Sequence, residues 1–91
     1  MLDSSSEAMR KEIHTFSQRL QDLKEELQER GKLSDAAHAL WNQVQQHKDQ
    51  LETKFSGAER TGSWASIRKE FVEDWNSLVV DVVALENQLY Q

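Results

Sequence analysis

Residues 64–89, WASIRKEFVEDWNSLVVDVVALENQL, decide the fold of this chain. Apolar side chains recur in this stretch at spacings of three and four residues. At about 100° per residue, that spacing places them on one narrow stripe of a helix. The stripe consists of Trp64, Ile67, Phe71, Trp75, Leu78, Val82, Leu85 and Leu89. Because the chain contains no proline, nothing interrupts a helix over about 63–90.

An earlier segment, about 7–30, shows the same periodicity in a narrower form. Its apolar residues alternate at spacings of four and three, as in the heptad seam of a coiled coil, and almost nothing apolar lies beside them. The seam consists of Met9, Ile13, Phe16, Leu20, Leu23 and Leu27. We therefore expect a first helix that contacts its neighbours along a single line.

The middle helix is expected over about 35–57, between two breaks in the pattern. Gly31 can end the first helix, and Ser34 can cap a new helix whose first turn carries an acidic residue. A loop is expected over 56–63, where two glycines and three hydroxyl residues occur without periodicity. The expected apolar stripe consists of Leu33, Ala37, Leu40, Val44, Leu51, Phe55 and Ala58, with Trp41 at its edge.

Three helices of similar length joined by short loops predict an all-α fold, an antiparallel up-down-up three-helix bundle, with residues 1–91 as a single helical domain. The alternative is a long coiled-coil helical hairpin in which the first two helices are continuous. In that case the first seam continues through Arg30, Ser34, Ala37, Trp41, Val44, Lys48, Leu51 and Phe55. An unbroken helix would place Arg30, Ser34 and Lys48 at core positions, and this favours the bundle.

The amino-acid composition excludes several classes of function. The chain has 91 residues and a net charge of −5, with 11 basic residues scattered among 16 acidic ones. No basic face is available to displace counterions, so we expect no nucleic-acid partner. The absence of cysteine excludes disulfides, a thiol nucleophile and thiolate metal sites. No run of 18 apolar residues occurs, so we expect no membrane span and a cytoplasmic protein.

Carboxylates and histidines do not form a recognisable catalytic or metal-binding pattern. Neighbouring acids, such as Glu73-Asp74, project about 100° apart and cannot share a proton. Asp35-x-x-His38 has the spacing by which a helix can present two ligands to one metal ion, but the motif occurs once and Asp35 is explained by the helix dipole. We therefore expect no enzyme, no catalytic residue, no cofactor and no metal.

A second apolar stripe on the last helix is the principal candidate for function. It lies about 100° from the main stripe and could form a homodimer or partner interface, or it could pack against the other two helices. Trp64 joins the candidates because it follows directly on the expected loop. The candidate interface residues are Val72, Val79, Val80, Val83, Tyr90 and Trp64.

The sequence thus predicts a non-enzymatic protein-interaction or assembly module, a homo-oligomer formed through the apolar face of the last helix. The alternative is a helical bundle that holds a small apolar or metal ligand between its helices, using Trp41, His47 and Trp75.

Two family patterns share parts of this description. The three-helix pattern with tryptophan is similar to that of a spectrin repeat, although the chain is short for one and Trp41 would fall in the middle helix. The size is also similar to that of secreted helical hairpins with a central Trp-x-Gly turn. Thr61-Gly62-Ser63-Trp64 reverses that order, and we assign no family from the sequence.

Overall fold

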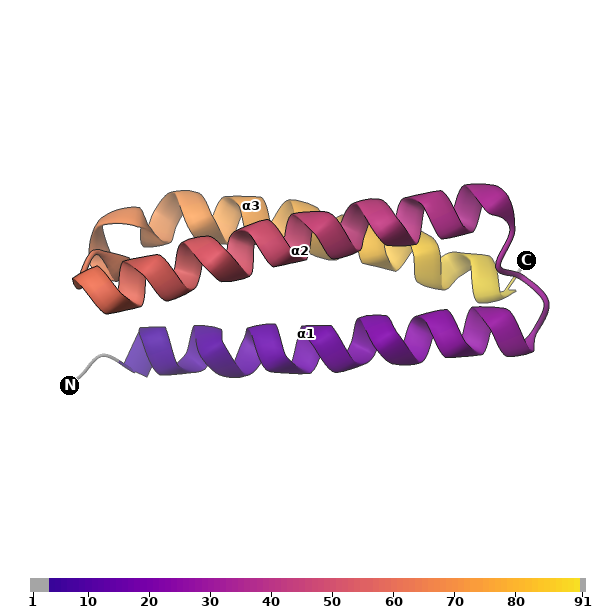
Figure 1. The fold of residues 1–91 in the computed structure, drawn as a ribbon, viewed down its shortest axis with the longest axis horizontal. Helices are drawn as coiled ribbons and strands as arrows, with labels where there is room; N and C mark the ends of the chain where they lie inside the picture. The colour runs from indigo at the N-terminus through magenta and orange to yellow at the C-terminus, as the bar shows by residue number, and fades with distance from the viewer. Residues whose placement is uncertain (1–3, 91) are drawn as a thin grey trace.

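The computed structural model describes residues 4–90, which form three long helices and a final short turn. These are α1 (Ser4–Glu29), α2 (Asp35–Thr61), α3 (Trp64–Asn87) and the 3-10 helix η1 (Gln88–Tyr90). The helices run up, down and up along an elongated body with extents of 46 × 19 × 17 Å (Figure 1). The predicted all-α three-helix bundle is confirmed, and the continuous helical hairpin is wrong.

The break between α1 and α2 has a hydrogen-bonded cause. Gly31 adopts a left-handed conformation with φ 66°, which glycine reaches without strain. Its N–H donates to the carbonyl of Gln28 at 3.1 Å, and the N–H of Lys32 donates to that of Leu27 at 2.8 Å. Ser34 then caps α2, because its Oγ accepts a hydrogen bond from the N–H of Ala37 at 3.1 Å. Gly31 therefore ends α1 and Ser34 caps α2, as the sequence predicts.

The connection between α2 and α3 is shorter than expected. The predicted loop over 56–63 is wrong, since α2 continues through Gly57 to Thr61 and only Gly62 and Ser63 separate the helices. Gly62 takes the left-handed conformation, with φ 74°. One glycine inside a helix costs about 1 kcal/mol, and burial of Phe55 and Ala58 on either side of Gly57 offsets that cost.

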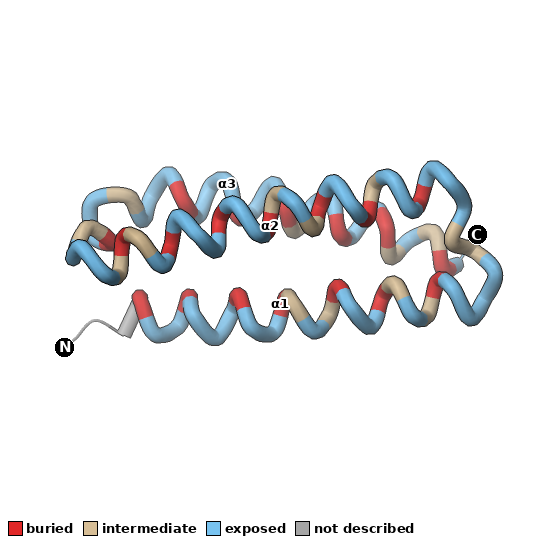
Figure 2. The backbone as a smooth tube through the Cα atoms, in the orientation of Figure 1, coloured by how far each residue is buried: buried red, intermediate tan, exposed pale blue. Residues whose placement is uncertain are grey.

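The core is one continuous apolar cluster enclosed by the three helices, as Figure 2 shows by the buried positions that line the inner side of each helix. All six seam residues of α1 are buried. From α3 the cluster takes Trp64, Phe71, Trp75, Leu78, Val82 and Leu85, and Leu89 extends it into η1. Ile67, expected in the stripe, is half-buried at its edge.

The phase of α2 differs from the expected one by a small rotation. Trp41 is buried and Leu40 is half-buried, the reverse of the prediction. The rotation turns Trp41 toward α1, where its Nε1 donates to the carbonyl of Leu20 at 2.9 Å. Lys24 also lies over the indole, with Nζ 4.4 Å from the ring centroid.

The same rotation places Lys48 on the buried side of α2, with 7% of its surface exposed. The expectation that a lysine could not occupy this position is wrong, because its ammonium finds partners at the rim of the core. Nζ lies 3.3 Å from Ser17 Oγ, 3.3 Å from Glu52 Oε1 and 3.1 Å from Asp49 Oδ1. Burial lowers the pKa of Lys48, but the two carboxylates more than compensate, so the pKa lies above its ordinary value.

α3 packs more closely against α2 than against α1. A chain of aromatic rings marks the tight side, with the ring centroids of Phe55 and Trp64 4.9 Å apart and those of Trp64 and Phe71 5.1 Å apart. Phe16 is the ring from α1, and its centroid lies 5.0 Å from that of Trp75. The flank of α3 toward α1 is therefore the more open one.

Candidate interaction surface

Two apolar faces share α3, and they differ in exposure. The first face is the buried stripe described above. The second, which we call the outer ridge, consists of Val72, Val79 and Val83 of α3 together with Tyr90 of the adjoining η1. Val72 is 36% exposed, Val83 41% and Tyr90 82%, whereas Val79 is half-buried against the core. Val80, at 66% exposure, lies farther round the helix. Five of the six candidate interface residues therefore reach the surface.

Trp64 is the exception among the candidates, because it lies in the buried stripe and does not reach the surface. Its side chain is only 5% exposed and lies edge-on to Phe55 and Phe71. The physical reason is the length of α2, whose last turns close this end of the bundle above the first residue of α3. Within residues 4–90, the buried Nε1 atoms of Trp64 and Trp75 have no hydrogen-bond partner.

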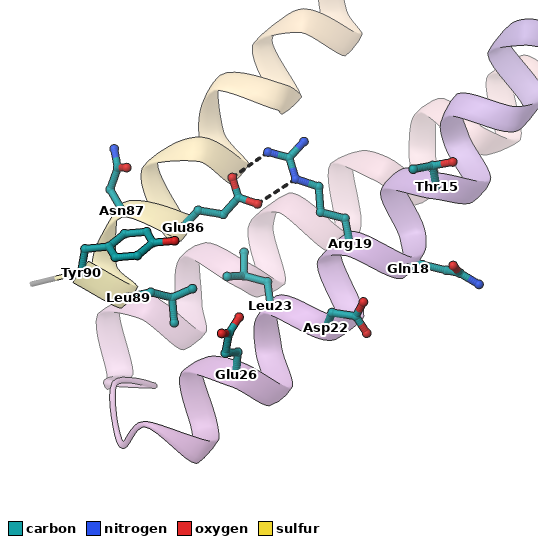
Figure 3. Close-up of a pocket in the computed structure, with 10 residues that line it drawn as sticks. All are labelled: Thr15, Gln18, Arg19, Asp22, Leu23, Glu26, Glu86, Asn87, Leu89 and Tyr90. Atoms are coloured by element: carbon teal, nitrogen blue, oxygen red, sulfur yellow. Dashed lines mark hydrogen bonds and ion pairs between the residues drawn. The ribbon is translucent and has the colours of Figure 1, made fainter.

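A groove of about 650 Å³ lies between α1 and the C-terminal end of α3 (Figure 3). Leu23 from α1 and Leu89 from η1 supply apolar surface, and Tyr90 lies at the end of the groove. The charged lining consists of Asp22, Glu26 and Glu86 together with Arg19, and Thr15, Gln18 and Asn87 supply uncharged polar groups. The groove lining therefore carries a net negative charge.

Arg19 and Glu86 join α1 to α3 across this groove by two hydrogen bonds (Figure 3). The guanidinium Nε lies 2.7 Å from Oε2 of the carboxylate and the second nitrogen lies 2.6 Å from Oε1, a bidentate geometry. These hydrogen bonds hold the pKa of Glu86 below its ordinary value and raise the pKa of Arg19, although partial burial opposes both shifts. No local pattern in the sequence indicates this pair, since its members are 67 residues apart.

A smaller hollow of about 410 Å³ lies at the other end of α3. All of its lining comes from the first three turns of that helix. Ala65 and Val72 provide apolar surface, and Arg68, Lys69 and Glu73 surround it. The two cations and one carboxylate give the lining of this hollow a net positive charge, opposite in sign to that of the groove beside Tyr90.

The residues of the ligand-binding alternative are not brought together. Trp41 contacts the backbone of α1, and Trp75 packs between Phe16 and Phe71. His47 is half-buried and lines a different, polar groove with Leu40 and Asp81. Among residues 4–90, no group of three His, Asp or Glu side chains is arranged to hold a metal ion.

None of the helices within the described part of the chain combines the length and the apolar content that crossing a bilayer requires. Comparison of the chain with protein-family models, curated proteins and solved structures finds no match. Function is therefore inferred from the geometry of α3 itself.

Proposed function

We propose that this protein is a non-enzymatic interaction module that self-associates through the outer ridge of α3. The observation that carries the proposal is the exposure of Val72, Val83 and Tyr90 on one flank of a helix whose other flank is already packed. A helix that only completes a bundle needs one apolar face, and the residues of the outer ridge lie beyond it.

The driving force for association is the transfer of apolar surface out of water. Complete burial of a valine side chain is worth about 1.5 to 3 kcal/mol, and the exposed parts of Val72 and Val83 represent a fraction of that in each copy. Tyr90 adds a large ring that is almost fully exposed, and tyrosine is enriched at protein–protein interfaces relative to the rest of the surface. A symmetric dimer gains each contribution twice.

The test is a pair of double variants that introduce the same charge on different faces of α3. Val72→Glu with Val83→Glu places two carboxylates on the outer ridge. Ser77→Glu with Ala84→Glu places them on a different exposed face of the helix and is the matched control. Light scattering after size exclusion should show a dimer for the unmodified chain and the control, and a helical monomer for the ridge variant. A ridge variant that keeps the dimer mass would contradict the proposal.

A further inference from the structure

The outer ridge belongs to a longer heptad seam. Two copies of this seam are complementary when they run in opposite directions. Spacings of four and three continue along the same flank of α3 through Ala65, Lys69, Val72, Asn76, Val79, Val83 and Glu86, and they extend to Tyr90 in η1. The midpoint of this series lies between Ser77 and Leu78. A second copy running in the opposite direction about that midpoint pairs Val72 with Val83 and Asn76 with Val79.

The charges along the seam agree with the reversed arrangement. It places Lys69 of each copy beside Glu86 of the other, whose carboxylate is already paired with Arg19, and it brings the positive hollow around Arg68 to the acidic groove that holds Asp22 and Glu26. A parallel arrangement would instead set Lys69 against Lys69 and Glu86 against Glu86, and like charges that meet across an interface are unfavourable. The helix dipoles also favour the antiparallel direction.

Shape complementarity at the ends of the seam is a second, independent observation. Tyr90 projects from one end of the seam with 82% of its surface exposed. At the other end, Ala65 leaves a shallow, open hollow between Arg68, Lys69 and Val72, the four-residue kind of hole into which a knob from a facing helix inserts. The register that pairs the valines also places Tyr90 over Ala65, where Arg68 and Lys69 of the second copy can contact the face of the ring.

We infer that the partner is a second copy of this chain, docked antiparallel along α3, with Tyr90 of each copy seated in the Ala65 hollow of the other. The inference rests on the proposed function and adds to it the direction and the register of the dimer. It assigns Tyr90 as the knob, the Ala65 hollow as its socket, and Lys69 with Glu86 as the charged pair that sets direction.

Exchanging the sizes of the knob and the socket tests the register. Ala65→Phe fills the hollow and Tyr90→Ala removes the knob, so each should raise the dissociation constant by about tenfold or more. Both positions are exposed, so the fold should tolerate the changes. In the double variant, the introduced phenylalanine of one copy faces the introduced alanine of the other, and most of the lost affinity should be recovered. A double variant that dimerises as weakly as the product of the two single changes would overturn the register.

Distances between spin labels test the direction of the second copy. Because the chain has no cysteine, one introduced cysteine is the only site that a thiol-reactive label modifies. Ser66→Cys and Ser77→Cys both place a label on exposed positions of α3 away from the ridge. At 1.5 Å per residue, the antiparallel register separates the two Ser66 positions by about 35 Å along the axis and the two Ser77 positions by about 2 Å. The Ser66 distance should therefore exceed the Ser77 distance by about 15 Å or more.

The label distances also distinguish a wrong direction from a wrong interface. Equal short distances at both positions would show a parallel dimer, which overturns the inference and leaves self-association through α3 intact. Long distances at both positions in a dimeric sample would show that another helix forms the contact, which overturns both the inference and the proposed function. No dipolar coupling together with a monomer mass at high micromolar concentration would also overturn both.

Discussion

The buried stripe and the outer ridge of α3 both consist of apolar residues, but only the stripe is buried against other helices of the same chain. Phe71, Leu78 and Val82 are fully enclosed by α1 and α2, whereas Val72 and Val83 retain more than a third of their surface in water. Periodicity identifies both faces equally well. What separates them is the number of neighbours: two helices can cover one broad stripe of a third, and the flank beyond that stripe stays open.

The largest expected difference between the two faces is in folding stability. Leu78→Ala removes a fully buried side chain and should lower the free energy of unfolding by about 2 to 5 kcal/mol. Val83→Ala, measured at low micromolar concentration where any dimer dissociates, should change it by about 0.5 kcal/mol or less. Chemical denaturation of both variants is the measurement. Equal losses would show that the ridge is part of the monomer core.

The two glycines Gly31 and Gly57 test the connections that keep the stripe covered. Gly31→Ala should destabilise by about 1 kcal/mol because it forces a Cβ into the left-handed conformation, although nothing lies within 4 Å of that Cβ. Gly57→Ala, inside α2 with equally open surroundings, should stabilise by about 0.5 to 1 kcal/mol. Denaturant midpoints that move in the same direction for both variants would contradict the assigned helix ends.

The smallest expected effect belongs to the ion pair at the border of the two faces. Because the pKa of Glu86 is lowered in the folded state, its contribution is present above pH of about 4.5 and is lost as the pH falls through the folded pKa. For a partly exposed pair the contribution is about 0.2 to 1 kcal/mol. Between about pH 5 and 3, the free energy of unfolding should fall less steeply with decreasing pH for Glu86→Gln than for the unmodified chain. The same pH dependence in both proteins would show that the ion pair contributes nothing to folding stability.

The parts of the fold that follow from local pattern were predictable. The seam of α1 and the cap formed by Ser34 are set by spacing and by side-chain chemistry within a few residues, and both are found as expected. The phase of α2 was contained only in the rejected continuous-helix alternative, whose seam runs through Trp41 and Lys48, because the choice depends on whether Lys48 can be buried. The long stem of Lys48 reaches carboxylates at the rim of the core. A rule that classes lysine only as a surface residue cannot predict this contact.

Tertiary contacts account for the remaining differences. Gly57 is a break signal in the sequence, yet the buried residues on both sides of it keep α2 helical to Thr61. That extension also buries Trp64, which the expected loop would have exposed. The valines of the outer ridge could be identified from spacing alone, but their exposure could not, since it depends on where α1 and α2 lie.

The central claim is that a second copy covers the outer ridge, and sedimentation equilibrium of the unmodified chain tests it most directly. Across about 10 to 500 µM we expect a reversible rise from the monomer mass to twice that mass. The rise should be only weakly sensitive to salt, because hydrophobic contacts dominate the interface. A monomer mass that persists to high micromolar concentration would contradict the claim.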